Sequence, residues 1–205
     1  MRAQVAKIVA LMLVSPVLAC SPSGALPGDA KAVAAAVAGL AAADAVERAA
    51  AACSLRDLGL TEAGVLAALE PLLADDRRVE GLSCGGHGWI DGAECLRITS
   101  PAREAARALA ELMPASLPVL LRSLGVPSAV TRAYAAYALG ESGDPRGGAP
   151  LLALLGDSSP RVRGNAAEAL GKLEAESAAE SLLLLLDDLE PEVRRAVVEA
   201  LAALG

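Results

Sequence analysis

The sequence predicts an all-α protein, an α-solenoid in which similar helix pairs stack in a row. The phrase "SSPRVRGNAAEALG" at 158–171 returns 31 residues later as "LEPEVRRAVVEALA" at 189–202, and a leucine-rich run precedes each copy. The chain has no Phe, two Tyr and one Trp, so its core must come from Ala, Leu and Val, which suit closely packed helices. Because one helix pair cannot bury its own apolar faces, such units stack into an array.

Residues 1–19 have the features of an export signal. Arg2 and Lys7 precede the apolar stretch "IVALMLVSPVLA", which is too short to span a bilayer. The stretch ends in "VLAC", which resembles the lipobox of bacterial lipoproteins, and this implies cleavage before Cys20 and lipid on it. An ordinary signal peptide cleaved elsewhere would leave that cysteine as a plain thiol. Ser21 resembles the outer-membrane sorting signal, so we expect an exported lipoprotein at the periplasmic face of the outer membrane.

The remaining chain divides into four segments by composition. They are a flexible Ser/Pro/Gly-rich tether at 20–28, an N-terminal helical region at 29–82, a Gly/Cys-rich loop at 83–101 and the repeats at 102–205. In the helical region, the Ala-rich, proline-free stretch 29–53 predicts one helix. Pro71 is expected to kink or restart the helix predicted for 60–79. Both helices are expected to form a prelude to the repeats.

The repeat units resemble the HEAT family, in particular the short HEAT-like repeats of phycobilisome lyases. The resemblance rests on an Asp, a Val and an Arg at equal spacing in two units: Asp157, Val162, Arg163, Asp188, Val193 and Arg194. It implies that the aspartates and arginines form a structural ladder of ion pairs along the stacked turns, while the valines fill the core. The unit at 117–147 departs from this pattern, with Val126 and Thr131 in place of Asp and Val, although Arg132 is kept.

The Gly-rich loop holds the residues of an alternative, chemical function. In an exported protein we expect a disulfide between Cys84 and Cys95, with pairing of Cys53 to either as the second possibility. A zinc site of these three cysteines and His87 is a further alternative, since thiolates and imidazole suit that ion. A nucleophilic pair of Cys84 and His87 lacks a side chain placed to orient the imidazole.

Charge and motif content exclude several other classes. The formal net charge is −7 without a Lys/Arg cluster, which argues against nucleic-acid binding. The single His excludes histidine-rich di-iron chemistry, and neither a catalytic triad nor a phosphate-binding loop is present. Asp75 and Asp76, like Asp187 and Asp188, are expected at helix ends in solvent rather than as metal ligands. We therefore predict no catalytic residue, no metal and no cofactor.

Two surfaces are candidates for binding a partner protein. Tyr134 and Tyr137 lie on a second helix of the repeats, which tends to line the concave side, so the pair could anchor a partner. The more ordinary use for them is half-buried packing. In the last helix, Val198 and Ala202 form a small apolar strip, and Arg194 and Arg195 lie at its rim. This end could dock a partner or a second copy of the chain.

The predicted function is therefore a lipid-anchored scaffold for protein–protein interaction at the bacterial cell envelope, held to the membrane through Cys20. The alternative is a metal-binding, ligand-binding or enzymatic module centred on Cys84, His87 and Cys95. A third possibility is a regulatory cap for a neighbouring membrane complex. The sequence does not identify the partner.

Overall fold

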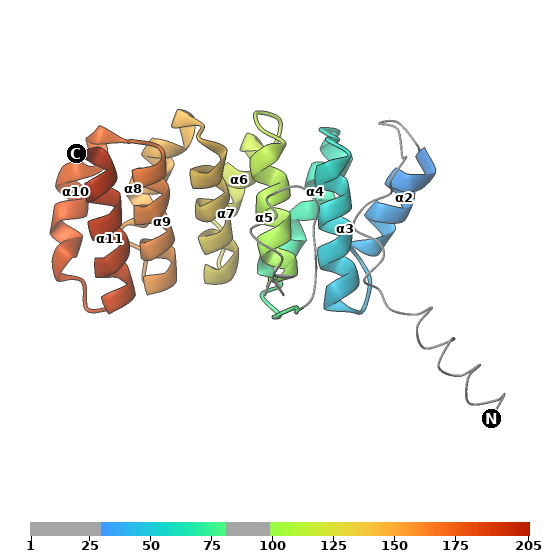
Figure 1. Cartoon of the computed structure of the whole chain (residues 1–205), viewed down its shortest axis with the longest axis horizontal. Helices are drawn as coiled ribbons and strands as arrows, with labels where there is room; N and C mark the ends of the chain where they lie inside the picture. The colour runs from blue at the N-terminus through green and yellow to red at the C-terminus, as the bar shows by residue number, and fades with distance from the viewer. Residues whose placement is uncertain (1–29, 81–98) are drawn as a thin grey trace, which may run out of the picture.

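The computed structural model describes residues 30–80 and 99–205. The predicted fold class is confirmed, because the described helices stack side by side in a row that runs from α2 to α11 (Figure 1). The helices are α2 (Ala30–Gly39), α3 (Ala45–Asp57), α4 (Ala63–Leu69), α5 (Pro101–Glu111), α6 (Leu117–Ser123), α7 (Ala129–Ser142), α8 (Gly148–Leu154), α9 (Pro160–Lys172), α10 (Ala179–Leu184) and α11 (Pro191–Leu204).

The solenoid has two layers. The longer helices α3, α5, α7, α9 and α11 pack on one another in sequence and form the front layer of Figure 1. The shorter helices α6, α8 and α10 each pack on the long helix that follows them. The core between the layers consists of Ala, Leu and Val, as the composition predicts.

The single helix predicted for 29–53 is wrong, because the chain forms two helices there. Helix α2 ends at Gly39 and α3 begins at Ala45, and the side chain of Asp44 caps α3 by accepting a hydrogen bond from the backbone N–H of Val46 at 3.2 Å. Aspartate is a strong N-cap residue, which explains the new start. Pro71 lies in the first turn of a 3₁₀ helix (Glu70–Ala74) that continues α4, in line with the expected restart.

Arginine and aspartate side chains join successive turns of the solenoid. Arg132 of α7 donates from Nε and Nη2 to the two carboxylate oxygens of Asp157, at 2.7 and 2.8 Å. Arg163 of α9 makes the same two bonds to Asp188, also at 2.7 and 2.8 Å. Each arginine also donates from Nη1 to carbonyls of the turn before its own helix. An arginine therefore pairs with the aspartate one unit further along the chain.

We call each such arginine–aspartate pair a rung. The region predicted to precede the repeats contains a rung of the same kind. Arg48 of α3 donates from Nε to Asp75 at 2.7 Å and from Nη1 to the carbonyls of Ala42 and Ala43. Helix α3 packs on α5, as α7 packs on α9. The stack of the structure therefore includes α3 and does not begin at residue 102.

The junction between α5 and α7 lacks a rung. Ala102 of α5 occupies the place that Arg132 has in α7, and Val126 occupies the place that Asp157 has one unit later. Both partners are therefore missing together. Replacing both members of a buried polar pair by apolar groups can leave stability nearly unchanged, whereas replacing one leaves the other buried without a hydrogen-bond partner.

Two glycines let the last long helices approach closely. A Cβ on Gly140 of α7 would lie 2.7 Å from Cα of Ala169, and a Cβ on Gly171 of α9 would lie 2.7 Å from Cα of Ala200. Such distances leave no room for a methyl group, so the helix backbones touch there. Helix α5 has Ala110 at the corresponding position.

Candidate protein-interaction surface

The outer face of the long helices carries both tyrosines of the chain, surrounded by cations. We call the set Arg103, Tyr134, Tyr137, Arg161 and Lys172 the tyrosine surface. Its members come from α5, α7 and α9, so three stacked units contribute. Both tyrosines are half-buried against the core, and three cations lie over their rings.

Tyr134 is the centre of a polar network. Its hydroxyl donates to Oδ1 of Asp76 at 2.7 Å and lies 3.1 Å from Oγ of Ser100. The guanidinium of Arg161 lies 4.8 Å from the centre of its ring and also pairs with Asp76. Burial raises the pKa of the Tyr134 hydroxyl, and Arg161 lowers the pKa of the Asp76 carboxyl. With all these partners satisfied, Tyr134 serves as a joint between α5, α7 and α9.

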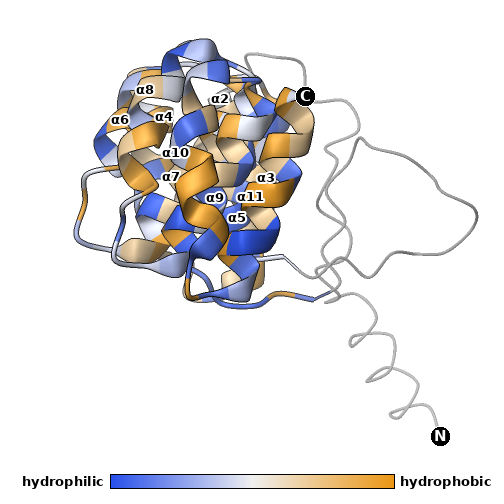
Figure 2. Cartoon of the chain, turned by 90° about the vertical axis from the view of Figure 1, so that its left-hand side faces the viewer, coloured by the Kyte–Doolittle hydropathy of each residue, from blue (hydrophilic) through white to orange (hydrophobic). Residues whose placement is uncertain are grey.

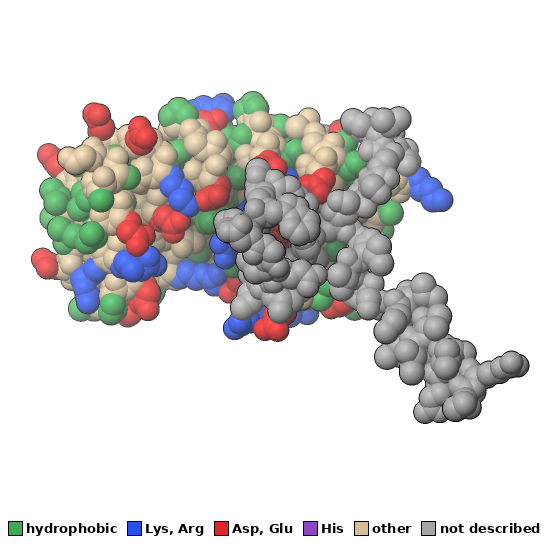
Figure 3. Space-filling model, in the orientation of Figure 1, with side chains coloured by type: hydrophobic (Ala, Val, Ile, Leu, Met, Phe, Trp, Pro, Cys, Tyr) green, Lys and Arg blue, Asp and Glu red, His purple; other side chains and the backbone are tan. Residues whose placement is uncertain are grey.

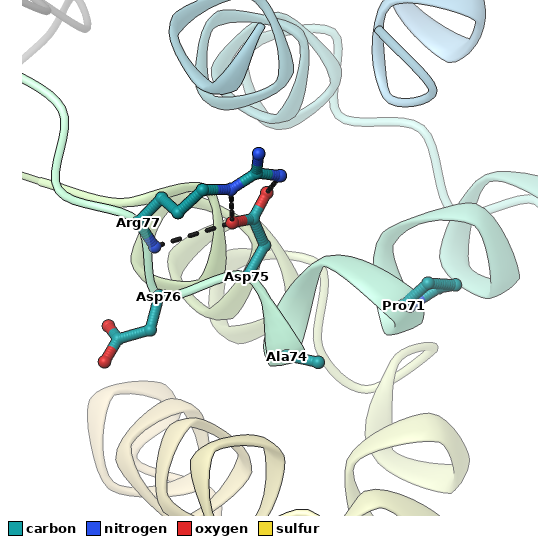
Figure 4. A pocket seen from close by; sticks show the side chains of 5 residues that line it. All are labelled: Pro71, Ala74, Asp75, Asp76 and Arg77. Atoms are coloured by element: carbon teal, nitrogen blue, oxygen red, sulfur yellow. Dashed lines mark hydrogen bonds and ion pairs between the residues drawn. The ribbon is translucent and has the colours of Figure 1, made fainter. Parts of the chain in front are cut away.

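The turn that holds Asp76 borders a shallow hollow of about 510 Å³ (Figure 4), lined by Pro71, Ala74, Asp75, Asp76 and Arg77. Asp75 accepts from Arg77 at 2.7 Å, and the carboxylate of Asp76 points away from that pair. Both aspartates follow the end of the 3₁₀ helix Glu70–Ala74, as expected, and Asp76 is exposed while Asp75 is half-buried. Both are in addition held in ion pairs, which the sequence did not predict. The hollow is thus walled by carboxylates that already have partners.

Tyr137 differs from Tyr134 in its surroundings. Arg103 lies 5.7 Å and the Lys172 amino group 5.5 Å from the centre of its ring, on two different neighbouring helices. Lys172 is also paired with Glu141 at 2.5 Å and Glu168 at 2.7 Å. Within the described part of the chain, the Tyr137 hydroxyl makes no hydrogen bond. Tyr137 is therefore the tyrosine with a polar group still available to a partner.

A buried carboxylate escaped the sequence analysis. Glu104 is 2% exposed and accepts from Oγ1 of Thr99 at 2.5 Å, while Nη1 of Arg56 lies 3.9 Å from it. The backbones of Val79 and Thr99 exchange two hydrogen bonds of 2.9 Å and clamp the ends of the segment between them. Its position in an otherwise Ala-rich helix face could have indicated from the sequence that this glutamate is buried.

Residues 83–98 of the loop predicted for 83–101 lie outside the described residues, and with them Cys84, His87 and Cys95; the lipidation candidate Cys20 lies outside them as well. Ser100 and Pro101, which the prediction placed in the loop, are the N-cap and first residue of α5. Cys53 is buried and disulfide-bonded. Over residues 30–80 and 99–205, no cluster of three or more His, Cys, Asp or Glu side chains could hold a metal ion. None of the helices in these two ranges has the length and apolar character needed to cross a membrane.

Apolar side chains are exposed at the α10–α11 end of the described solenoid. Leu184 and Leu189 are 81% and 91% exposed, and Val198 is 56% exposed. Hydrophobic side chains gather at this end in Figure 3, and Figure 2 looks onto it. Of the predicted rim, Arg195 pairs with Glu199 at 2.6 Å, whereas Arg194 is turned back onto backbone carbonyls. The exposed leucines enlarge the strip that the sequence analysis placed around Val198.

Comparison with known proteins agrees with the solenoid. Residues 117–202 match the family model for HEAT repeats. No curated protein matches the sequence. The structure resembles the complex of CpcE and CpcF of phycocyanin lyase from Nostoc sp. PCC7120, with a TM-score of 0.55 and 24% identity over 90% of this chain and 67% of that chain.

Two further structures share the fold at lower identity. Importin beta matches 84% of this chain with a TM-score of 0.57 and 17% identity, and the match covers 25% of that chain. A designed armadillo repeat protein in complex with the peptide (KR)4 has a TM-score of 0.50 and 21% identity, over 85% of this chain and 82% of that one. A HEAT-like solenoid is thus a fold found in scaffolds, and one of the similar structures belongs to a lyase.

Proposed function

We propose that this protein is a scaffold, anchored by lipid on Cys20 at the bacterial cell envelope, that binds a partner protein on the tyrosine surface. The observation that carries the proposal is Tyr137, a half-exposed aromatic side chain flanked by Arg103 and Lys172. Tyrosine and arginine are the residues most often found at the energetic centres of protein interfaces. The rigid stack beneath them presents the surface without a cost of ordering.

A photo-crosslinking experiment tests the binding surface. A photoreactive phenylalanine at Tyr137 is expected to capture a discrete partner from isolated envelopes. The same residue at Leu121, which is 38% exposed on the opposite layer, is the matched control and should capture nothing comparable. Equal capture at both positions would count against the tyrosine surface.

Membrane anchoring has its own test, because it rests on the sequence "VLAC". Cys20→Ser should move the protein from the membrane to the soluble fraction, and the wild type should incorporate labelled fatty acid. An acyl chain contributes about 0.8 kcal/mol per buried CH₂, so its loss should release the protein. Membrane association that survives the substitution, together with an unlabelled wild type, would remove the anchor from the proposal.

The competing hypothesis is the module centred on Cys84, His87 and Cys95. The disulfide at Cys53 favours oxidised cysteines over a zinc site, since thiolates are the metal ligands. We propose that Cys53 pairs with Cys84 or Cys95, the second of the two pairings that the sequence left open. Non-reducing peptide mapping tests the pairing, and stoichiometric zinc in envelope-purified protein would support the metal site instead.

Self-association through the C-terminal end is the second contact we propose. The exposed apolar side chains of Leu184, Leu189 and Val198 support it. Val198→Glu should leave helix content and melting unchanged and should weaken any self-contact measured by sedimentation. If the protein is monomeric with and without the substitution, the C-terminal end is not a self-association surface, and only the tyrosine surface on the long helices remains proposed.

A further inference from the structure

The arginines of the described residues fall into two groups. Nearly all of them form an ion pair with a carboxylate or donate to backbone carbonyls: Arg48, Arg56, Arg77, Arg78, Arg122, Arg132, Arg146, Arg161, Arg163, Arg194 and Arg195. Within these ranges, only Arg103 and Arg107 lack any such acceptor for the side chain. A guanidinium offers five donors in a fixed fork, so the two together present a set of unused donors.

Both arginines lie on one side of α5. Their spacing of four residues places them one helical turn apart, at about 5–6 Å between Cβ atoms. Arg103 is exposed and contacts the ring of Tyr137, and Arg107 is half-exposed. Arg107 thus lies one helical turn from the Arg103 side chain that contacts Tyr137, at the N-terminal edge of the tyrosine surface.

The carboxylates near these two arginines are already bound elsewhere. Asp76 pairs with Arg161, while Glu141 and Glu168 pair with Lys172. Glu111, one turn beyond Arg107, lies 3.7 Å from Arg56 and is not within ion-pair distance of Arg107. Neither Arg103 nor Arg107 therefore has a carboxylate partner among the described residues.

Because these two guanidiniums have unused donors, we propose that Arg103 and Arg107 bind an acidic segment of a partner protein, with Tyr137 packing against the segment. The inference rests on the proposed function and specifies the chemistry of the partner. Two carboxylates separated by one residue in an extended segment lie about 6.6 Å apart, which matches the spacing of the arginines. Arginine and carboxylate form paired hydrogen bonds that are stronger than neutral ones.

Fluorescence anisotropy with a labelled (Glu-Leu)₄ peptide tests the inference on the full chain in detergent. The wild type should bind this peptide and not (Lys-Leu)₄, and raising the salt from about 50 to about 500 mM should weaken binding several-fold. Arg103→Gln with Arg107→Gln should weaken binding about ten-fold or more. Arg122→Gln with Arg146→Gln is the matched control, because these arginines are 59% and 56% exposed and are already paired.

Several results would overturn the inference. They are no binding by the wild type, binding of both peptides alike, or equal loss in the control variant, with circular dichroism showing that each variant is folded. Sedimentation that reveals a dimer abolished by the Arg103/Arg107 variant would make a second copy of the chain the acidic partner and overturn it as well. If the partner crosslinked at Tyr137 still binds that variant, the scaffold proposal stands and the acidic partner does not.

Discussion

The α7–α9 and α5–α7 junctions join the same kind of helices by different means. At the α7–α9 junction, Arg132 grips Asp157 with two hydrogen bonds, and Gly140 lets the backbones meet. At the α5–α7 junction, alanine or valine occupies each of these places. That junction is joined instead by the network of Tyr134, in which Asp76 and Arg161 lie 85 residues apart.

The difference shows that stacking of the long helices does not depend on every rung. Ala102 is buried and Val126 is half-buried, and because both are apolar, neither leaves a charge without a partner. The Tyr134 network then supplies the polar contacts across the α5–α7 junction. These contacts lie on the face of the long helices that also carries Tyr137. At the α5–α7 junction, the residues that join the helices thus belong to the tyrosine surface or contact it.

The largest expected effect is the loss of a rung. Asp157→Ala leaves Arg132 without its carboxylate and should lower the free energy of unfolding by about 3 kcal/mol, because a half-buried charge is left unpaired. Val126→Ala, at the same place in the α5–α7 junction, should cost less than about 1.5 kcal/mol. Urea unfolding of both variants measures the contrast, and similar losses would refute it.

Close packing gives the next largest effect. Gly140→Ala should lower the free energy of unfolding by about 1–2 kcal/mol, since the new methyl group meets the backbone of Ala169. Gly164→Ala in α9 is the matched control: its nearest neighbour would be 4.0 Å away, so the better helix propensity of Ala should raise stability by about 0.5–1 kcal/mol. Equal signs in thermal or urea unfolding would contradict the close approach.

The network at the α5–α7 junction is expected to contribute less. Tyr134→Phe removes the hydrogen bond to Asp76 and should lower the free energy of unfolding by about 1 kcal/mol. Tyr137→Phe, three residues along the same helix, should change stability by less than about 0.5 kcal/mol, because its hydroxyl has no acceptor among the described residues. Chemical unfolding of the two variants in parallel checks that Tyr134 stabilises the fold through its hydroxyl and that Tyr137 does not.

Acid should weaken the rungs before the apolar core. Arg132 holds the pKa of Asp157 below its usual value, and Arg163 does the same for Asp188. A carboxyl whose pKa is lower in the folded state stabilises the fold fully above its unfolded pKa, about 3.9, and loses this contribution as the pH falls through the folded value. Asp157→Asn should therefore flatten the fall in stability below about pH 4, as measured by unfolding at pH 3 to 6.

The sequence by itself determined the helix pairs and their stacking. The 31-residue spacing of Leu139, Leu170 and Leu201 is a local pattern, and the apolar faces it creates can only be buried against neighbouring copies. The rung of Arg48 could not be predicted from this pattern. The break between α2 and α3 before Asp44 and the long insertion after Val79 interrupt the 31-residue spacing in the N-terminal part.

Only the tertiary structure decided which side chains meet across units. Arg163 pairs with Asp188 of the next turn, and Arg161 reaches Asp76, and such pairings depend on the rise and rotation from one unit to the next rather than on spacing along the chain. Tyr134 and Tyr137 stand three residues apart on one helix face, yet one is satisfied by a network and the other is not. What separates them is the set of neighbours that the stacked helices bring up, which no local pattern specifies.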